Sequence, residues 1–119
     1  MNKKGFTLAE LLIAVGILAV AILGLLALFV NVMLMNESNY NLVTAVNDAQ
    51  FVLEQMRPIA YDDLDDYSPP DFINLQNETE SVTVSNPPGG SIAEITVTIG
   101  WTERNRNRNF QLSTRFVKQ

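Results

Sequence analysis

An acidic side chain stands where a long apolar run begins, close to the start of this sequence. Glu10 is followed by a run from Leu11 to Val30 that carries no charge. An ionised carboxylate is costly inside a membrane-length segment, so it must take up a proton or pair with a cation. Thr7, three residues earlier, offers another role, because a Thr-x-x-Glu spacing can cap the start of a helix. The residues alone leave both roles open.

The composition argues against catalysis. The chain has no histidine and no cysteine, which removes the commonest general base, the commonest metal ligand and any thiolate site. No serine, aspartate or lysine is spaced as a nucleophile with its base. The net charge of −5 disfavours direct binding of nucleic acid, which needs clustered Lys and Arg. We therefore expect neither an enzyme nor a cofactor.

An acidic stretch without cations runs from Tyr61 to Glu80. Its carboxylates could supply oxygen ligands to calcium, and the weak candidates are Asp62, Asp63, Asp65 and Asp66. The spacing does not match an EF-hand, and Pro69-Pro70 interrupts the stretch. A solvated acidic loop is the simpler interpretation, so we expect no metal.

Basic residues gather instead in the C-terminal tail, at Arg104, Arg106, Arg108, Arg115 and Lys118. This asymmetry could let the acidic loop of one subunit face the basic edge of a neighbour. Two solvated faces of opposite sign are the plainer alternative, because exposed ion pairs contribute little.

The apolar run has the length of a membrane-spanning helix. Twenty helical residues span about 30 Å, the thickness of a bilayer's hydrocarbon core. Lys3 and Lys4 precede it, which predicts a single pass with the N-terminus in the cytoplasm and the remainder outside. A secretory signal peptide is disfavoured because the run is long and lacks a small-x-small site at its end. A plain membrane anchor explains everything except Glu10 and the residues just before it.

The rest of the chain predicts a helix followed by a small sheet. Apolar residues continue at helical spacing to Pro58, which cannot continue a helix, so we expect one helix from Thr7 to Arg57. Its expected packing stripe is Met35, Asn39, Leu42, Val46, Ala49, Leu53 and Met56. Residues 59–76 indicate an irregular connection. Alternation predicts three strands, at 81–85, 93–102 and 109–117, with a polar turn at 104–107. The second strand is expected to set Ile95, Val97, Ile99 and Trp101 on one face. The expected fold is α+β, a long helix packed on a three-stranded antiparallel meander.

The start of the chain resembles a known family. Gly5-Phe6-Thr7-Leu8-Ala9-Glu10, between two lysines and the apolar run, is similar to the N-terminus of type IV prepilins, the class of pilins and secretion-system pseudopilins. The resemblance implies that prepilin peptidase cuts between Gly5 and Phe6 and methylates the Phe6 amine. It also implies that Glu10 pairs with the Phe6 amine of an adjacent subunit in a filament.

That resemblance divides the chain into four segments. Residues 1–5 form the leader and 6–30 the transmembrane or filament-core helix. Residues 31–57 form the amphipathic helix of a head, and 58–119 add the acidic loop and the antiparallel sheet of the same head.

A second resemblance suggests the kind of subunit. Ala49–Arg57, Tyr61–Leu64 and the Thr-Val-Thr-Ile-Gly-Trp segment look like their counterparts in PilV-type minor pilins and I-type minor pseudopilins of type II secretion. This implies a structural subunit of a type IV pilus or pseudopilus in the bacterial inner membrane, with a periplasmic head. Its partners would be prepilin peptidase and other pilin or pseudopilin subunits. The alternative is a single-pass, membrane-anchored periplasmic binding module that uses the acidic loop or basic edge.

Overall fold

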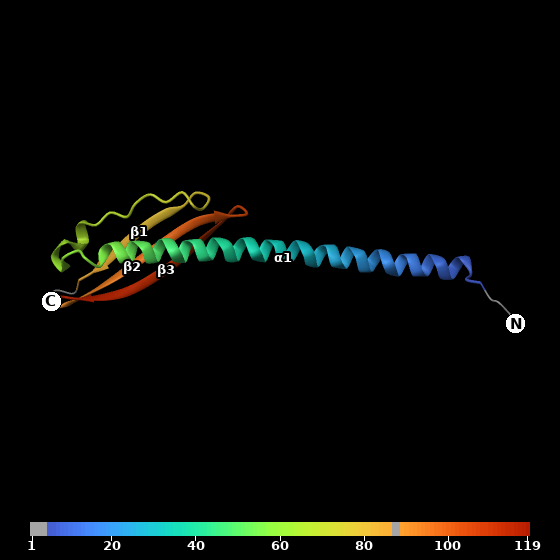
Figure 1. Ribbon diagram of the computed structural model, residues 1–119, viewed down its shortest axis with the longest axis horizontal. Helices are drawn as coiled ribbons and strands as arrows, with labels where there is room; N and C mark the ends of the chain where they lie inside the picture. The colour runs from blue at the N-terminus through green and yellow to red at the C-terminus, as the bar shows by residue number, and fades with distance from the viewer. Residues whose placement is uncertain (1–4, 87–88) are drawn as a thin grey trace. The chain divides into compact units, whose positions relative to one another are not determined.

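The chain folds into one long helix and a three-stranded sheet (Figure 1). The computed structural model describes residues 5–86 and 89–119, so the first four residues of the predicted leader, Lys3 and Lys4 among them, lie outside the described part. The elements are α1 (Leu8–Met56), the 3-10 helix η1 (Tyr61–Asp66), and the strands β1 (Thr79–Ser85), β2 (Ile92–Glu103) and β3 (Arg106–Val117). This α+β composition confirms the predicted fold. The chain divides into two compact units, Met1–Glu37 and Ser38–Gln119.

Helix α1 has the predicted extent to within one residue at each end. It begins after Thr7, whose side chain caps it, and it ends at Met56. The Arg57 amide still donates to the Leu53 carbonyl at 3.2 Å, but Pro58 has no N–H to continue the ladder. The sequence signals at both ends therefore correspond to the observed boundaries.

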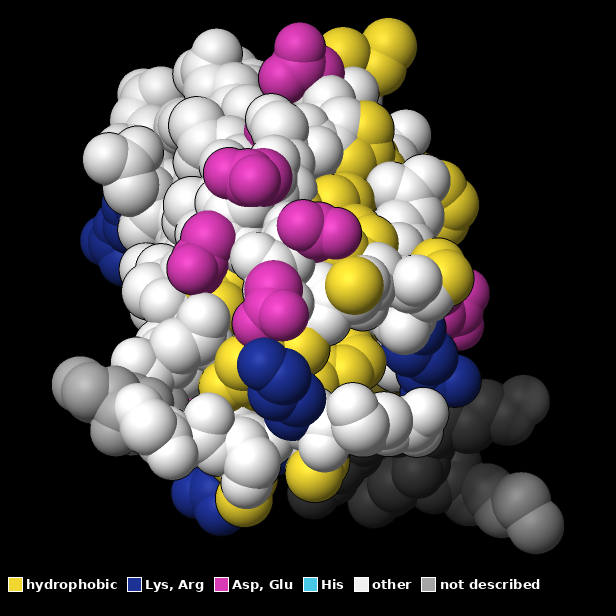
Figure 2. All heavy atoms as spheres, turned by 90° about the vertical axis from the view of Figure 1, so that its left-hand side faces the viewer, with side chains coloured by type: hydrophobic (Ala, Val, Ile, Leu, Met, Phe, Trp, Pro, Cys, Tyr) yellow, Lys and Arg dark blue, Asp and Glu magenta, His cyan; other side chains and the backbone are white. Residues whose placement is uncertain are grey.

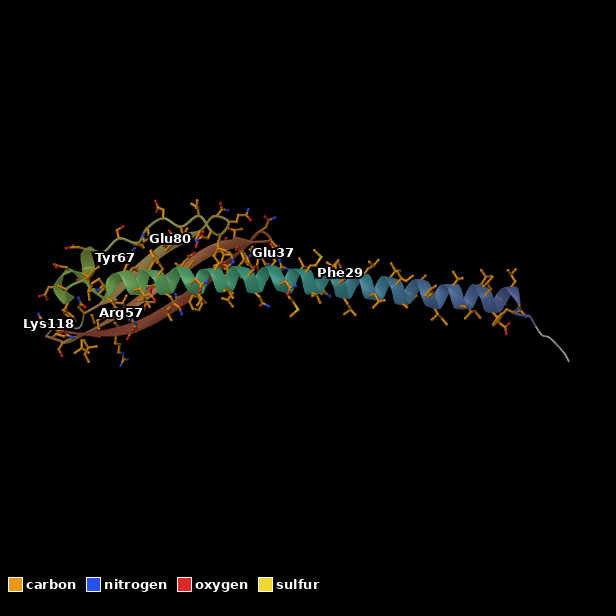
Figure 3. The ribbon with its side chains drawn as sticks, viewed as in Figure 1. Phe29, Glu37, Arg57, Tyr67, Glu80 and Lys118 are labelled. Atoms are coloured by element: carbon orange, nitrogen blue, oxygen red, sulfur yellow. The ribbon has the colours of Figure 1, made fainter. Side chains whose placement is uncertain are left out.

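In the first unit, α1 exposes its apolar side chains all round. From Leu11 to Val30 the large hydrophobic side chains are between 49% and 70% exposed. Figure 3 shows the side chains of this part of the helix, Phe29 among them, standing away from it on both sides. Among the described residues, α1 is the one helix long and apolar enough to cross a membrane.

In the second unit, the C-terminal part of α1 crosses one face of the sheet (Figure 1). The strands are antiparallel in the order β1-β2-β3, and Val97 of the central strand pairs with Val82 and Leu112. The core joins α1, η1, β2 and the segment before β1, through Ala45, Ala49, Val52, Met56, Leu64, Leu75, Ala93, Ile95, Val97, Ile99 and Trp101. The predicted inward face of β2 is thereby confirmed.

The predicted packing stripe of α1 is correct only toward the end of the helix. Ala49 and Met56 are buried as expected, whereas Met35, Asn39 and Leu42 are exposed. The inward positions are instead Ser38, Asn41, Ala45, Asp48 and Val52, all buried or half-buried. The prediction, which rested on hydrophobicity, was wrong here because the first inward positions, Ser38 and Asn41, are polar and hydrogen-bond to the buried carboxylate of Glu103.

The strands are longer than predicted, and the β2–β3 turn is shorter. The expected polar turn at 104–107 is wrong by two residues, because the connection is Arg104-Asn105 alone. Both residues have positive φ, 48° and 60°, as the primed two-residue hairpin turns require. This tight turn extends β2 to Glu103 and starts β3 at Arg106.

The expected irregular connection contains η1 and an ordered segment beside α1. The Tyr67 hydroxyl donates to Gln55 Oε1 at 2.8 Å, and the Phe72 ring meets the Phe51 ring edge-on with centroids 6.0 Å apart. Asn74 Nδ2 then donates to Asp48 Oδ1 at 3.1 Å. Successive contacts move back along the helix, so the segment runs antiparallel to it.

Two carboxyl groups meet where this segment leaves the helix. Glu78 Oε2 accepts the amides of Asn74 and Leu75 at 2.9 and 3.0 Å, while its buried Oε1 has no hydrogen-bond partner among the described residues. Burial, together with the neighbouring Asp48 carboxyl, raises the pKa of Glu78 to about 7. A proton on Glu78 lets the two side chains hydrogen-bond rather than repel each other.

This pair predicts a pH-dependent stability. The folded state keeps a proton on Glu78 up to about pH 7, whereas the unfolded state releases it near 4.5, so the free energy of unfolding should fall as pH rises between these values. Glu78→Gln should remove this slope and stabilise the protein by about 1–2 kcal/mol at mildly alkaline pH, allowing for solvent screening. Denaturant unfolding in detergent micelles, followed by the fluorescence of the single tryptophan, Trp101, measures both effects.

Glu80→Gln is the matched control. Glu80 also accepts a backbone amide, that of Phe72 at 2.8 Å, and the substitution removes the same charge from the same segment. It should leave the slope between about pH 4.5 and 7 in place. Equal slopes in the Glu78→Gln variant and the parent chain would contradict the shared proton.

Candidate processing and assembly site

Thr7 and Glu10 hold the start of α1 through a reciprocal pair of hydrogen bonds. The Thr7 amide donates to Glu10 Oε2 at 2.8 Å, and the Glu10 amide donates to Thr7 Oγ1 at 3.2 Å. This is a capping box, which satisfies two backbone donors that a helix start leaves free. The capping role of Glu10, one of the two that the sequence left open, is thus present in the structure. Its pairing with a neighbouring subunit's amine stays a prediction.

The peptide bond between Gly5 and Phe6 lies just outside the helix, in exposed backbone. Both residues are exposed, and a side chain added at Gly5 would meet no atom within 4 Å. The capping box uses the Thr7 amide and hydroxyl, and neither belongs to the Gly5–Phe6 bond. Cleavage there would therefore leave the box intact and place a new amine one residue before Thr7.

The acidic residues considered for calcium follow one another along η1. Residues three apart eclipse in a 3-10 helix, which sets Asp62 with Asp65 and Asp63 with Asp66. Figure 2 shows acidic side chains gathered on this end of the second unit. Within residues 5–86 and 89–119, no group of three or more acidic side chains is placed to hold a metal ion.

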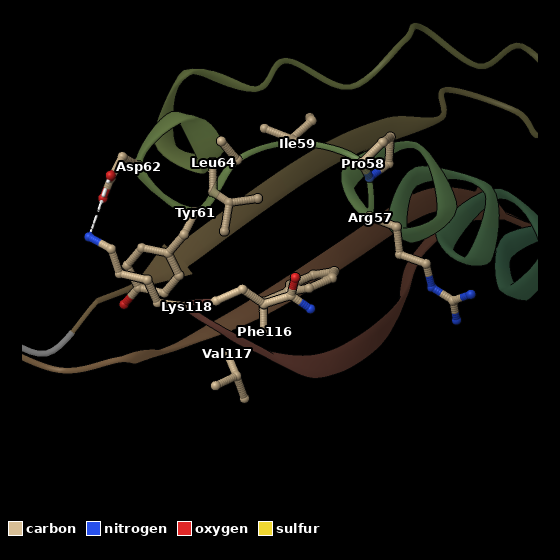
Figure 4. A pocket seen from close by; sticks show the side chains of 11 residues that line it. Arg57, Pro58, Ile59, Tyr61, Asp62, Leu64, Phe116, Val117 and Lys118 are labelled. Atoms are coloured by element: carbon tan, nitrogen blue, oxygen red, sulfur yellow. Dashed lines mark hydrogen bonds and ion pairs between the residues drawn. The ribbon is translucent and has the colours of Figure 1, made fainter.

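A shallow hollow lies beside η1, where α1 and β3 end (Figure 4). It measures about 460 Å³, and its walls include Tyr61, Leu64 and Phe116. Lys118 Nζ lies over the Tyr61 ring, 5.5 Å from its centroid, and forms an ion pair with Asp62 at 3.1 Å. The hollow thus offers an aromatic wall and an ion pair between Lys118 and Asp62.

Glu103 is a buried carboxylate that the sequence analysis did not single out. Its Oε1 accepts Asn41 Nδ2 at 2.9 Å, and its Oε2 accepts Ser38 Oγ at 3.2 Å and Arg104 Nη2 at 3.3 Å. The Asn41 bond, helped by those from Ser38 and Arg104, outweighs burial and lowers the pKa of Glu103 below its ordinary value. An ionised side chain here fastens the β2–β3 turn to α1.

Strand and helix periodicity contained the signal for these buried acids. Glu103 follows Ile99 and Trp101 at the inward alternation of β2, and Asp48 lies between Ala45 and Val52 on the inward helical face. Neither residue was among the predicted inward positions, because charged residues are seldom fully buried. Their hydrogen-bond partners come from distant parts of the sequence, so burial could not be inferred locally.

Comparison with known proteins bears on the N-terminal part of the chain. Residues 1–29 match the family described as the prokaryotic N-terminal methylation motif. No curated protein and no solved structure gave a match. The match spans the Gly5–Phe6 bond, the capping box and most of the apolar run. The chain therefore carries the prepilin-type methylation motif, which supports a type IV pilin-like, membrane-anchored structural protein processed by prepilin peptidase.

Proposed function

We propose that this protein is a structural subunit of a type IV pilus or a type II secretion pseudopilus. In this proposal, prepilin peptidase removes residues 1–5 and methylates the Phe6 amine, and the subunit assembles through residues 6–30. The head, formed by residues 31–57 and 58–119, faces the periplasm. The observation that carries the proposal is the match of residues 1–29 to the methylation motif.

The geometry of the first unit supports this role. A helix whose large side chains are about half or more exposed is unstable in water, so lipid or other helices must cover it. The exposed Gly5–Phe6 bond suits proteolysis, and Glu10 lies four residues after the amine that cleavage would create. Both features fit a chain that resides in the membrane first and in a helical bundle later.

The capping box and the assembly role of Glu10 are compatible. The Thr7 bond uses Oε2 of Glu10, and a carboxylate has lone pairs for further donors on both oxygens. The Phe6 amine of an adjacent subunit can then pair with the same side chain. A one-step slip of a subunit would leave a charge unpaired among apolar helices, so this pair would fix axial register.

We further propose a minor subunit, similar to the PilV-type minor pilins or the I-type minor pseudopilins. Support comes from the Ala49–Arg57 helix end, from the small head, and from a central strand that contains Thr-Val-Thr-Ile-Gly-Trp. The absence of cysteines excludes a disulfide-closed C-terminal loop.

Processing predicts a defined mass. Protein recovered from its native membrane should lack residues 1–5 and carry one added methyl group at Phe6, as read by intact-mass spectrometry. Gly5→Val should block the cut, because the branched side chain sits at the scissile bond while the open space around Gly5 leaves the fold unchanged.

Gly24→Val is the control, since Gly24 also has no atom within 4 Å of its added Cβ but lies inside the helix. It should be processed normally. A full-length, unmethylated mass for the parent chain would contradict the proposal and leave a plain membrane anchor.

Glu10→Gln separates the charge of this side chain from its capping role. Glutamine also completes a capping box, so α1 should begin at the same residue and processing should continue. Loss of the charge should reduce recovery in sheared filaments or pseudopili at least about tenfold, as expected when one buried ion pair fails to form.

Glu37→Gln, which removes an exposed carboxylate elsewhere on α1, should assemble like the parent chain. Normal recovery of the Glu10→Gln variant would show that Glu10 acts as a helix cap alone.

The alternative function is a single-pass, membrane-anchored periplasmic binding module. The hollow lined by Tyr61, Phe116 and Lys118 is the feature that favours it. This alternative predicts an uncut N-terminus and full tolerance of Glu10→Gln, so the two experiments above also decide between the functions.

A further inference from the structure

Three arginines surround the β2–β3 turn. Arg104, Arg106 and Arg108 line a hollow of about 250 Å³ together with Glu103. The side chains of Arg104 and Arg108 are 41% and 50% exposed, whereas that of Glu103 is almost completely buried. Three positive charges and one negative charge leave this arginine turn with a net charge of +2.

Glu103 positions two of the arginines, Arg104 and Arg108, and leaves most of their N–H groups available for other acceptors. Its Oε2 lies 3.3 Å from Arg104 Nη2 and 3.6 Å from Arg108 Nε, and its other bonds go to α1. A guanidinium carries five N–H donors, so most donors of both groups remain for an outside acceptor. Phosphate is an acceptor that this fork geometry fits, because two of its oxygens can accept parallel bonds from one guanidinium.

The arginine turn is fixed at the end of the second unit where the chain enters it. Glu103 binds Ser38 and Asn41, the first residues of that unit, and η1 with its aspartates lies at the other end of the sheet (Figure 1). The step from Val30 to Ser38 spans about 12 Å at the helical rise. Only residues 31–37 separate the apolar run from Ser38 along the chain, so the arginine turn is tethered by this short segment to the end of that run.

We propose that the arginine turn binds the phosphates of anionic phospholipids at the membrane from which α1 emerges. The inference rests on the proposed membrane anchoring. Between Leu11 and Met56 the chain has no basic residue, and the turn, bonded through Glu103 to Ser38 and Asn41, brings positive charge to the start of the second unit. A negative surface potential attracts such groups.

A lipid surface fits better than the acidic loop of a second copy. The tether through residues 31–37 keeps the turn close to the headgroups whenever the chain is anchored, whereas η1 of another copy lies at the far end of its own unit.

The proposed lipid contact is distinct from the charge rule that orients a membrane helix. The arginines come more than seventy residues after the apolar run, too far along the chain to influence the orientation of that run in the membrane.

The test uses a spin label at Asn107→Cys, an exposed position of β3 beside the turn, in the full-length chain, which has no other cysteine. The protein is reconstituted into vesicles of phosphatidylcholine alone or of equal parts phosphatidylcholine and phosphatidylglycerol, and relaxation by a nickel-chelating lipid reports proximity to the headgroups. The label should be headgroup-proximal in the anionic vesicles and released by salt. Arg106→Gln should lower the ratio of proximal to distal label about fivefold.

Arg106 is the arginine to change because, within residues 5–86 and 89–119, Glu103 forms ion pairs with Arg104 and Arg108 but not with Arg106. Arg115→Gln is the matched control, since it removes one exposed arginine from the same strand, where it pairs with Glu94. Its ratio should equal that of the parent chain.

Equal proximity in both kinds of vesicle, or equal loss in both arginine variants, would overturn the inference. If the ratio of proximal to distal label rises with the density of protein in the vesicles at fixed lipid composition, the turn contacts a second copy, and the inference is overturned as well. Vesicle flotation of the same samples separates this failure from failure of the proposed function: a chain that does not float is not anchored, whereas a floating chain without a phosphatidylglycerol effect loses only the lipid contact.

Discussion

The apolar surface of the first half of α1 is the constraint on which the rest of the molecule depends. About twenty consecutive residues present large hydrophobic side chains in every direction, so no single face can be buried against a sheet. Such a helix needs a solvent that is apolar on all sides, either a bilayer or a bundle of similar helices. One helix of 49 residues also takes a large share of the chain, which restricts the remainder to a small head with a single sheet.

Hydrogen bonds to carboxylates, as well as the apolar core, attach the C-terminal part of α1 to the rest of the head. Glu103 connects the β2–β3 turn to Ser38 and Asn41, and Asp48 connects the segment before β1 to the middle of the packed region. Apolar contacts between a helix and a sheet tolerate sliding, whereas these bonds are satisfied in one axial position. We infer that the buried acids set that position, because a shift by one turn would leave a charge unpaired.

Glu10 caps its own helix, and in the proposed assembly it would have a second partner. Glu10 satisfies the start of its own helix in the single chain, so the isolated subunit does not leave the carboxylate without hydrogen bonds. In the proposed assembly the same group would also meet the amine of a neighbouring chain, because both oxygens can accept more than one donor. Capping therefore lowers the free-energy cost of placing the Glu10 carboxylate at the edge of an apolar run, and the side chain can still carry a charge.

The sequence by itself determined the features that rest on local rules. Charge-free length predicted the apolar half of α1, Thr7 and Pro58 predicted its ends, and alternation predicted the inward face of β2. The Gly5–Glu10 pattern predicted the methylation motif that the comparison with known proteins supports.

Only the tertiary structure decided which polar residues are buried. Ser38, Asn41 and Asp48 occupy inward positions, displacing the expected stripe of Met35, Asn39 and Leu42, because Glu103 and Asn74 reach them from distant parts of the sequence. The arginine turn likewise comes to the start of the head only through the bonds of Glu103 to α1. The physical reason is that burying a polar group is favourable only when a partner is in place, and no local pattern can specify a partner some sixty residues away.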